Sequence, residues 1–425
     1  MLPLVPMAHP VRLIIVGAGS RGAVYAAWVR AHPEAAQIVA VAEPRAVSRE
    51  QVARVHGLRA DAVVADWREL ADRPRFADAV VIATPDALHA EPAIAFADLG
   101  YHLLLEKPMA PSPADCARIV ATVERRGVML AVGHVLRYTA YTARLKAILD
   151  AGRIGEIASL AHLEPVGYWH QAHSFVRGNW RAEGLTAPML LSKSCHDLDW
   201  IRYVLGERCV RVSSFGGLRH FRADARPAGA AERCLDCAVE RSCPYSAVKI
   251  YLGRVRTGDL GWPVDVLTSD LTEAGVTRAL RTGPYGRCVY ACDNDVVDHQ
   301  VVAMQFASGA TATFTMTGFT RQRDRETRIF GTRGELHGDG TTIEVHDFLT
   351  DRTETIRTDD AVATDGHGGG DARLMARFVA AVASGDRTQI LSGPAESLES
   401  HLMVFAAEQA RREGRVVDVD LARPA

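Results

Sequence analysis

The sequence predicts an α/β protein of two domains, a doubly wound parallel sheet followed by an α+β domain with an open, mostly antiparallel sheet. Residues 1–135 alternate short, continuously apolar segments with segments of helical spacing, as buried parallel strands and their crossover helices do. Residues 136–425 contain longer segments of partial alternation joined by glycine turns, which favours antiparallel hairpins. Residues 222–294, rich in Cys, Pro, Arg and Gly, interrupt this second pattern as an insertion would.

The strands of the first domain are expected at five apolar segments, VRLIIVG, QIVAVAE, DAVVIATP, HLLLEKP and VMLAVGH. Helical spacing fills the gaps between them, and two of these helices are expected to end at Gly100 and Gly127, as helix C termini commonly do. Apolar strands that alternate with helices form a parallel sheet covered on both faces. The expected helices lie over residues 23–32, 48–57, 87–100 and 112–127.

The second domain is expected to begin with a helix over residues 141–155 and to end with helices over 371–385 and 398–414. These helices would cover one face of the antiparallel sheet and leave the other face open. The expected strands and strand pairs lie over residues 157–165, 210–221, 301–319, 326–340 and 341–349.

The composition excludes several classes of protein. The 49 basic and 51 acidic side chains nearly cancel, so the chain lacks the electrostatic footprint of a protein that binds nucleic acid or an anionic membrane. No apolar segment approaches the roughly 20 residues that span a bilayer. The first residues lack the basic start and the cleavage site of a secretory signal. We therefore expect a cytoplasmic protein with neither a nucleic-acid nor a membrane partner.

A glycine-rich turn follows the first expected strand. Gly17, Gly19 and Gly22 stand in G-x-G-x-x-G spacing between a strand and a helix. The first glycine permits a tight turn, the second lets a pyrophosphate approach the backbone, and the third lets the helix pack against the strand. Glu43 follows 21 residues after Gly22, where a carboxylate would accept hydrogen bonds from the adenosine ribose and favour NAD. The neighbouring Arg45 could hold a 2′-phosphate, which leaves NADP as the alternative.

Polar residues follow two further strands of the first domain. Thr84 and Pro85 come at the end of one strand, and Glu106 and Lys107 come at the end of the next. Ligands of open α/β sheets bind at the carboxyl ends of the strands. A nicotinamide held by the glycine turn would therefore lie near Lys107, which makes this lysine a candidate for proton transfer.

The segment LLSKSCHDLDW, residues 190–200, carries five ionisable side chains among apolar neighbours. If it is one helix, Lys193 and His196 share a face, so the lysine would position a substrate hydroxyl or lower the pKa of the histidine. The ordinary pKa of histidine lies near working pH, which favours a proton relay, and Asp199 could orient the imidazole. A metal site is disfavoured because adjacent Cys195 and His196 side chains point apart, and a lone buried cysteine is usually inert.

These motifs, with IATPDALHAEPAIAFADLGYHLLLEKPMA, CHDLDWIRYVLG and IFGTRGEL, resemble the glucose–fructose oxidoreductase, inositol dehydrogenase and rhizopine-catabolism (Gfo/Idh/MocA) family. The resemblance implies a Rossmann domain and an open sheet that commonly mediates oligomerisation, so a homo-oligomer, dimer or tetramer, is expected. It also implies hydride transfer between a nicotinamide cofactor and a hydroxyl carbon of a sugar, glycoside or cyclitol. Two alternatives stay open: a glycosidase that oxidises the sugar transiently with tightly held NAD, and a non-catalytic nicotinamide-binding sensor.

The family pattern assigns roles to individual residues. The lysine of its EKP motif corresponds to Lys107 and its second-domain histidine to His196. Many members carry an aspartate four residues before that histidine, where this chain has Ser192 followed by Lys193. We therefore expect catalysis by Lys107 and His196, assisted by Lys193. The residues expected to bind the cofactor are Gly17, Gly19, Ser20, Arg21, Gly22, Glu43, Arg45, Thr84, Pro85, His89, Glu106 and Lys107.

The segment EPVGYWHQAHSFVRGNWR is rich in aromatic and planar polar side chains. Sugars are recognised by stacking on aromatic faces and by planar polar groups, so this segment is a candidate substrate wall. Aromatic residues in loops pack structurally more often than they bind, which leaves that alternative open for each. The expected substrate-binding residues are Lys107, Tyr168, Trp169, His173, Trp180, Arg181, Lys193 and His196.

Five of the eight cysteines cluster in the insertion. RCLDCAVERSCPYSA has C-x2-C-x5-C spacing, and GRCVYAC adds two thiols farther along. Four thiolates around a structural zinc would fold a loop that lacks its own apolar core. Free thiols without a metal and an iron–sulfur cluster are the alternatives. The expected ligands are Cys234, Cys237, Cys243 and Cys288, with Cys292 as the alternative to Cys288.

Overall fold

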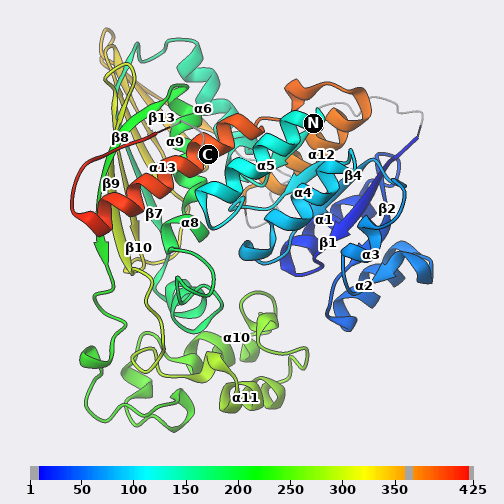
Figure 1. Cartoon of the computed structure of the whole chain (residues 1–425). Helices are drawn as coiled ribbons and strands as arrows, with labels where there is room; N and C mark the ends of the chain where they lie inside the picture. The colour runs from blue at the N-terminus through cyan, green and yellow to red at the C-terminus, as the bar shows by residue number, and fades with distance from the viewer. Residues whose placement is uncertain (1–8, 359–366, 421–425) are drawn as a thin grey trace.

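A computed structural model of the chain describes residues 9–358 and 367–420, which form two sheets and a separate lobe below them (Figure 1). The first sheet has six parallel strands in the order β3-β2-β1-β4-β5-β6, so the predicted doubly wound sheet is confirmed. Sequence analysis missed one short edge strand, β3. The strands are β1 (Val11–Val16), β2 (Ala36–Ala42), β3 (Val63–Val64), β4 (Ala79–Ile82), β5 (His102–Leu105) and β6 (Leu130–Val132).

Helices cover both faces of this sheet. The cap residues explain their limits: Ser112 accepts a hydrogen bond from the amide of Asp115 at the start of α5, and Gly127 ends that helix with a φ of 63°. The helices that follow the first five strands in the chain are α1 (Ser20–Ala31), α2 (Ala46–His56), α3 (Arg68–Ala71), α4 (Ala90–Asp98) and α5 (Pro113–Arg126).

One helix from the far end of the chain also packs on the first sheet. The side chains of Leu374 and Phe378 on α12 (Gly370–Ser384) are buried in one apolar cluster with Leu13 of β1 and Tyr25 of α1. Figure 1 shows α12 beside α1 and β1. The division of the chain expected at residue 135 stays a prediction, and α12 shows that residues beyond it help to build the first layer.

The second sheet has nine strands in the order β14-β13-β12-β11-β7-β10-β9-β8-β15. Among the described residues its neighbours pair antiparallel except β7 and β10, so the mostly antiparallel sheet is confirmed. Sequence analysis missed β14 and β15. The strands are β7 (Ile157–Pro165), β8 (Cys209–Gly217), β9 (His299–Phe306), β10 (Thr311–Thr317), β11 (Glu326–Gly331), β12 (Gly334–Gly338), β13 (Thr342–Asp347), β14 (Arg352–Arg357) and β15 (Val417–Asp418).

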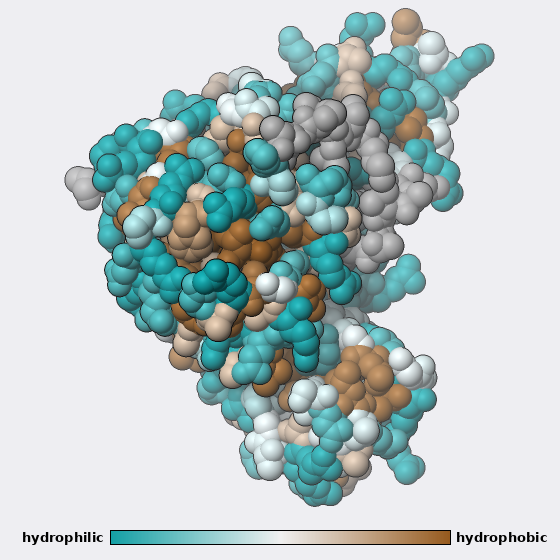
Figure 2. Space-filling view, turned by 90° about the vertical axis from the view of Figure 1, so that its right-hand side faces the viewer, coloured by the Kyte–Doolittle hydropathy of each residue, from teal (hydrophilic) through white to brown (hydrophobic). Residues whose placement is uncertain are grey.

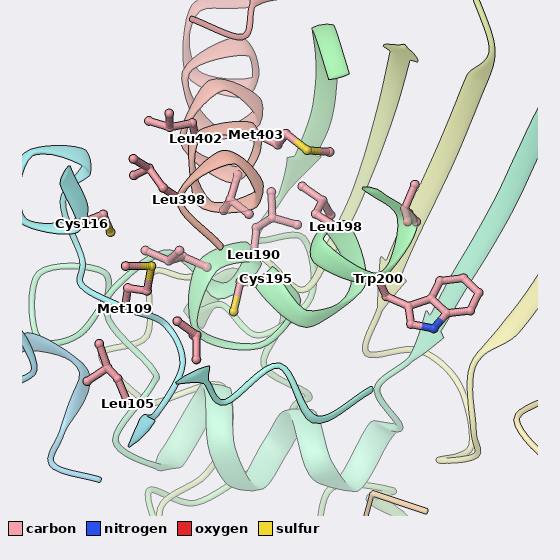
Figure 3. Packing of buried hydrophobic residues seen from close by; sticks show 14 of the residues in the cluster. Leu105, Met109, Cys116, Leu190, Cys195, Leu198, Trp200, Leu398, Leu402 and Met403 are labelled. Carbon is pink, nitrogen blue, oxygen red and sulfur yellow. The ribbon is translucent and has the colours of Figure 1, made fainter. Parts of the chain in front are cut away.

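The inner face of the second sheet is covered by helices, and a single apolar core joins it to the first domain. Leu105 of β5, Cys195 on α9 and Leu398 on α13 belong to one buried cluster. Figure 3 shows these side chains meeting between the two domains. This shared core fixes the end of β5 relative to α9, so the two domains hold their site residues in register. The helices are α6 (Ala140–Asp150), α7 (Tyr168–His170), α8 (Met189–Ser192), α9 (Cys195–Leu205) and α13 (Pro394–Glu413).

The insertion forms the lobe below the sheets, between β8 and β9 (Figure 1). It contains α10 (Gly253–Arg256) and α11 (Glu273–Thr282). Contrary to the expectation from sequence, the lobe has an apolar cluster of its own, which includes Tyr251, Val264 and Leu280. The prediction was wrong because these apolar residues are spread among polar ones at no regular spacing. The insertion can therefore bury a core without help from a metal.

Candidate active site

The glycine turn has the geometry that a dinucleotide needs. Gly17 has a φ of 90°, and a Cβ there would lie 2.6 Å from the carbonyl oxygen of Ala83. A Cβ on Gly22 would lie 2.0 Å from the carbonyl oxygen of Gly17, so this helix packs close only without a side chain. A Cβ on Gly19 would meet Arg45 alone, at 3.3 Å, and α1 begins at the next residue, Ser20. The turn therefore fits a pyrophosphate at the N terminus of α1.

The acidic residue after β2 is held by its neighbours. The buried carboxylate of Glu43 accepts hydrogen bonds from the amide of Ala18 at 2.8 Å and from the amide of Arg45 at 2.9 Å. The guanidinium of Arg45 donates to both carboxylate oxygens, at 2.8 and 3.0 Å. Burial acts to raise the pKa of Glu43, but these donors hold it below its ordinary value. Glu43 therefore stays an anion beside the glycine turn, with Arg45 laid over it.

Two residues predicted to bind the cofactor are engaged with each other. Arg21 donates from Nε to Glu106 at 2.6 Å and from Nη2 to the Tyr25 hydroxyl at 2.9 Å. The Tyr25 hydroxyl donates to Glu106 at 2.5 Å, and both terminal nitrogens of Arg21 reach the carboxylate of Asp371 on α12. Burial acts to raise the pKa of Glu106, but the charge of Arg21 holds it below its ordinary value. This network supports the glycine turn from beneath and ties it to the strand end that carries Lys107.

The end of β4 is tied to the end of β5 through His89. The ring of this buried histidine has Nδ1 2.7 Å from the carbonyl oxygen of Pro108 and Nε2 2.9 Å from that of Thr84. Both ring nitrogens therefore face backbone carbonyls. His89 thus connects the loop after β4, which contains Thr84 and Pro85, to the loop after β5.

Lys107 reaches from the first domain into the second. Its backbone amide donates to Glu106 at 3.0 Å, and its Nζ donates to the carbonyl oxygen of Ser192 at 2.7 Å. Ser192 is four residues before His196, a buried residue in the first turn of α9. Burial, and then the positive charge of Lys107, lowers the pKa of His196 well below its ordinary value. The structure thus brings Lys107 and His196 together, with the imidazole neutral at neutral pH.

Lys193 lies elsewhere than the sequence suggested. The segment from 190 to 200 is not one helix, because α8 ends at Ser192 and α9 begins at Cys195. Lys193 stands at this break, and its Nζ forms an ion pair with Glu164 of β7 at 2.9 Å. Its charge lowers the pKa of His170, after burial, rather than that of His196. The expected helical face was wrong, since a backbone break separates the two residues.

A second ion pair at this wall was not found from the sequence. Arg325, just before β11, lies with Nε 2.9 Å from Glu164 and 2.7 Å from Asp197. Burial opposes the charge of Asp197, but Arg325 and His162 hold its pKa below the ordinary value. No sequence signal marks Arg325, because its partners are more than 100 residues away. Lys193, Glu164 and Arg325 form a charged wall beside the Lys107–His196 pair.

Two further histidines lie beside His196, and neither was singled out as a site residue from the sequence. The His134 ring lies 6.1 Å from the His196 ring between centroids, and the His367 ring lies 6.0 Å from it. His367 has Nδ1 2.8 Å from Asp371, the carboxylate that also holds Arg21. Asp199, a candidate to orient His196, instead accepts from Arg137 at 2.7 and 2.6 Å. A row of imidazoles therefore links His196 to the network under the glycine turn.

The predicted substrate wall divides into two groups. Trp180 lies toward the first domain, because its indole N–H donates to Asp86, in the turn after β4, at 3.3 Å, whereas Trp169 packs on Trp262 of the insertion, with the ring centroids 5.1 Å apart. His173 precedes the insertion in the chain and is buried against it, with Nδ1 2.8 Å from the Tyr251 hydroxyl, so it supports the lobe. The remaining two also serve contacts within the second domain: Tyr168 lies under the ammonium of Lys249, and Arg181 pairs with Asp293 at 2.9 Å.

The cysteines of the insertion gather around one cavity of about 160 Å³. Its lining includes the four expected ligands, and Arg177 reaches within 3.5 Å of the Cys234 sulfur. Cys292 is not in that lining and lies with Sγ 3.2 Å from the carbonyl oxygen of Cys288. Within residues 9–358 and 367–420, no three His, Cys, Asp or Glu side chains are arranged to hold a metal ion. The four expected ligands, Cys234, Cys237, Cys243 and Cys288, therefore line one cavity but are not arranged around a metal position in the described part of the chain.

The thiol in the 190–200 segment is a core side chain. Cys195 is buried against Leu190 and Met109 in the core between the domains (Figure 3). Burial raises the pKa of this thiol to about 12. A thiol held neutral in an apolar core neither attacks a substrate nor binds a metal. The contribution of Cys195 is packing.

Comparison with known proteins identifies relatives over most of the chain. Residues 11–134 match the model of an oxidoreductase family with an NAD-binding Rossmann fold, and residues 146–419 match its C-terminal alpha/beta domain. Inositol 2-dehydrogenase of Streptomyces avermitilis is 33% identical over 209 residues, which cover 49% of this chain and 57% of that protein. The scyllo-inositol 2-dehydrogenase (NAD(+)) of Bacillus subtilis is 30% identical over 287 residues, covering 67% and 71%. The chain thus spans little more than half the length of the first of these relatives.

Solved structures share the whole fold. Levoglucosan dehydrogenase in complex with NADH superposes with a TM-score of 0.70 at 19% identity, covering 97% of this chain and 100% of that one. An oxidoreductase domain protein from Kribbella flavida gives 0.72 at 18% identity, with the same coverage. Identities this low establish the architecture and nothing finer. Among the described residues, each helix is too short or too polar to cross a membrane.

Proposed function

The chain belongs to the Gfo/Idh/MocA family of NAD-binding oxidoreductases, and from this premise we propose that it transfers a hydride between NAD and a hydroxyl carbon of a sugar, glycoside or cyclitol. The observation that carries the proposal is the contact of Lys107 Nζ with the carbonyl oxygen of Ser192, which places the ammonium beside His196. Lys107 follows β5 at the carboxyl edge of the first sheet, where the glycine turn after β1 also opens, and His196 lies on α9 of the second domain. Relatives that act on inositols support a polyhydroxylated substrate.

The proton of the substrate hydroxyl would be handled by two residues. NAD, which the glycine turn and Glu43 would hold, would supply the acceptor for the hydride that leaves the carbon. The His196 imidazole, held neutral by burial and by the charge of Lys107, accepts the hydroxyl proton. The Lys107 ammonium donates a hydrogen bond to the same oxygen and stabilises its developing negative charge. Lys193, fixed by Glu164, positions a neighbouring hydroxyl of the ring.

The cofactor is proposed to be NAD, with NADP as the alternative. Glu43 offers its carboxylate at the site of the adenosine ribose, and a carboxylate repels a 2′-phosphate. Arg45 is the group that could hold this phosphate, but in this structure its guanidinium is bound to Glu43. NADP would therefore require Arg45 to leave Glu43.

The test is a spectrophotometric screen of sugars, glycosides and inositols at alkaline pH, run with NAD and with NADP. Reduction of the cofactor by members of one substrate class is the expected result. Release of free sugar from a glycoside without net reduction of the cofactor would instead establish the glycosidase alternative. Cofactor binding without any turnover across the panel would favour the sensor and reject the dehydrogenase.

We also propose that the insertion binds one structural zinc through Cys234, Cys237, Cys243 and Cys288. The support is that all four line one cavity, and that Cys288 rather than Cys292 does so. The thiols would have to turn toward one another and lose their protons, because burial raises the pKa of Cys243 and of Cys288. Metal analysis of protein purified without a histidine tag is expected to return one zinc per chain. A value well below one would reject the site.

The assembly and compartment are proposals as well. Phe215 of β8 and Val301 of β9 are exposed, and they are paired neighbours on the open face of the second sheet. We propose that this face packs on a second copy of the chain in a dimer or tetramer. All eight cysteines are free, which supports a reducing compartment such as the cytoplasm. Light scattering of the native chain and of Phe215→Glu tests the assembly, with a loss of mass expected for the variant.

A further inference from the structure

The insertion reaches the substrate wall through one tryptophan. Trp262 lies between α10 and α11, and its ring centroid is 5.1 Å from that of Trp169 and 4.9 Å from that of His170. Despite these contacts, 41% of Trp262 is exposed. Leu260 and Val266 beside it in the chain are exposed as well, and Figure 2 shows apolar side chains gathered on the lobe that the insertion forms. The lobe thus presents an open indole face at the edge of the site.

The wall behind Trp262 is fixed in place. The guanidinium of Arg254 lies 4.4 Å from the Trp169 ring centroid, and Arg254 forms an ion pair with Asp259 at 2.5 Å. The His173 ring, 5.4 Å from that of Trp262, is held by the Tyr251 hydroxyl. An aromatic ring that is held on one side and open on the other is preorganised to stack on a ligand.

The same wall continues to the reacting groups. His170 contacts Trp262 on one side, and its ring is close enough to Lys193 for that charge to lower its pKa, after burial. Within the described residues, the buried Nδ1 of His170 has no hydrogen-bond partner. The wall therefore runs from Lys193 through a histidine with an unused nitrogen to an exposed indole. A ligand longer than one sugar ring would pass these residues in that order.

Resting on the proposed dehydrogenase function, we propose that the insertion supplies a second subsite, in which Trp262 stacks against a ring linked to the sugar that reacts at Lys107 and His196. The occupant is the flat apolar face of a second sugar ring or of an aryl group. The substrates are therefore glycosides, and a free sugar or cyclitol leaves Trp262 uncovered.

The test compares pairs of ligands that differ only in the second group. Methyl and 4-nitrophenyl glycosides of glucose, galactose and mannose, with a disaccharide of each, are titrated by calorimetry into the native chain saturated with NADH. For at least one sugar we expect the larger ligand to bind about tenfold more tightly, as a stacked aromatic contact predicts. Trp262→Ala and Trp262→Leu should reduce that preference to less than about twofold and leave the methyl glycoside unchanged, while Trp262→Phe should keep most of it.

The matched control is Phe348→Ala, which removes an exposed aromatic ring from the turn after β13 and should change neither affinity. Trp262→Leu keeps an apolar side chain on the lobe, so it separates loss of stacking from loss of folding. Equal binding within every pair by the native chain, or a preference that survives both Trp262→Ala and Trp262→Leu, would overturn the subsite. A preference that depends on Trp262, without hydride transfer from any ligand, would keep the subsite and reject the dehydrogenase.

Discussion

The two halves of the site treat buried polar groups differently. The cofactor half consists of Arg21, Tyr25, Glu106 and Asp371, and these side chains satisfy one another. The substrate half consists of His134, His170, His196 and Asp197. Within the described residues, each member of the substrate half has at least one buried nitrogen or oxygen without a hydrogen-bond partner.

This difference indicates in which half the protein itself satisfies the hydrogen bonds of its buried polar groups. A buried polar atom without a partner costs about 1–3 kcal/mol of stability. Proteins retain such atoms where water or a ligand supplies the missing hydrogen bond. The cofactor half is therefore a finished scaffold, and the substrate half is left for the hydroxyls of a ligand to complete. Substitutions in the first half should act on stability, and those in the second half on turnover.

The largest expected effect is at Lys107, whose charge acts on His196 of the substrate half, and its absence would break the comparison. Lys107→Met should lower kcat about 10²- to 10⁴-fold, because the alkoxide loses its stabilising ammonium. The affinity for NADH and the free energy of unfolding should change little, since Lys107 contacts Ser192 by a single hydrogen bond. Steady-state kinetics and NADH titration measure both. Lys146→Met, which removes a surface lysine of α6, is the control, and near-normal kcat in Lys107→Met would contradict the assignment.

The next effect tests the cofactor half. Asp371→Asn removes a charge from the network of Arg21 and should lower the free energy of unfolding by about 2 kcal/mol, a value reduced for the partial exposure of Arg21. The comparison predicts that kcat at saturating cofactor falls less than in Lys107→Met. Urea unfolding measures the first effect. Asp61→Asn, in an exposed pair with Arg59, should cost much less, and an equal loss in both variants would refute the distinction.

Sequence analysis was most successful where local rules determine structure. The glycine turn, the five longer strands of the first sheet and the caps of α5 follow from spacing and residue type alone. It failed at Lys193, because no helix-breaking residue marks the break between α8 and α9, and the Ser192 carbonyl at that break accepts from Lys107, which is far away in the sequence. Arg325 and the contact of His367 with His196 could not be found, since the tertiary fold alone brings these groups together.

A smaller effect concerns the buried histidines, which extend the comparison to pH. Burial lowers the pKa of His134 to about 3 and that of His401 to about 4. The unfolded chain protonates these rings below about pH 6.5 while the folded chain does not, so stability falls as pH falls from 6.5 toward 4. Each should contribute a loss of about 1 kcal/mol between pH 6.5 and 5.5.

Urea unfolding at these two pH values, with His401→Gln beside the native chain, measures one ring at a time. The variant should lose about 1 kcal/mol less than the native chain over this interval. The control is His337→Gln, which removes an exposed histidine of β12. An identical slope in the native chain and His401→Gln would show that the His401 ring is already charged in the folded state.

The smallest expected effect concerns Arg45, an exposed residue beside the glycine turn. Arg45 is 62% exposed in its side chain, yet it occupies both oxygens of Glu43, the carboxylate that faces the adenosine ribose. Arg45→Ala should free these oxygens and raise the affinity for NAD a fewfold, while it removes the only cation proposed for a 2′-phosphate and lowers the affinity for NADP. Arg59→Ala, another exposed arginine, should change neither affinity. Calorimetric titration with both dinucleotides measures the two affinities. A rise in the affinity for NAD together with a fall in the affinity for NADP is the expected result. An equal fall in both affinities would mean that Arg45 binds a phosphate that the two dinucleotides share.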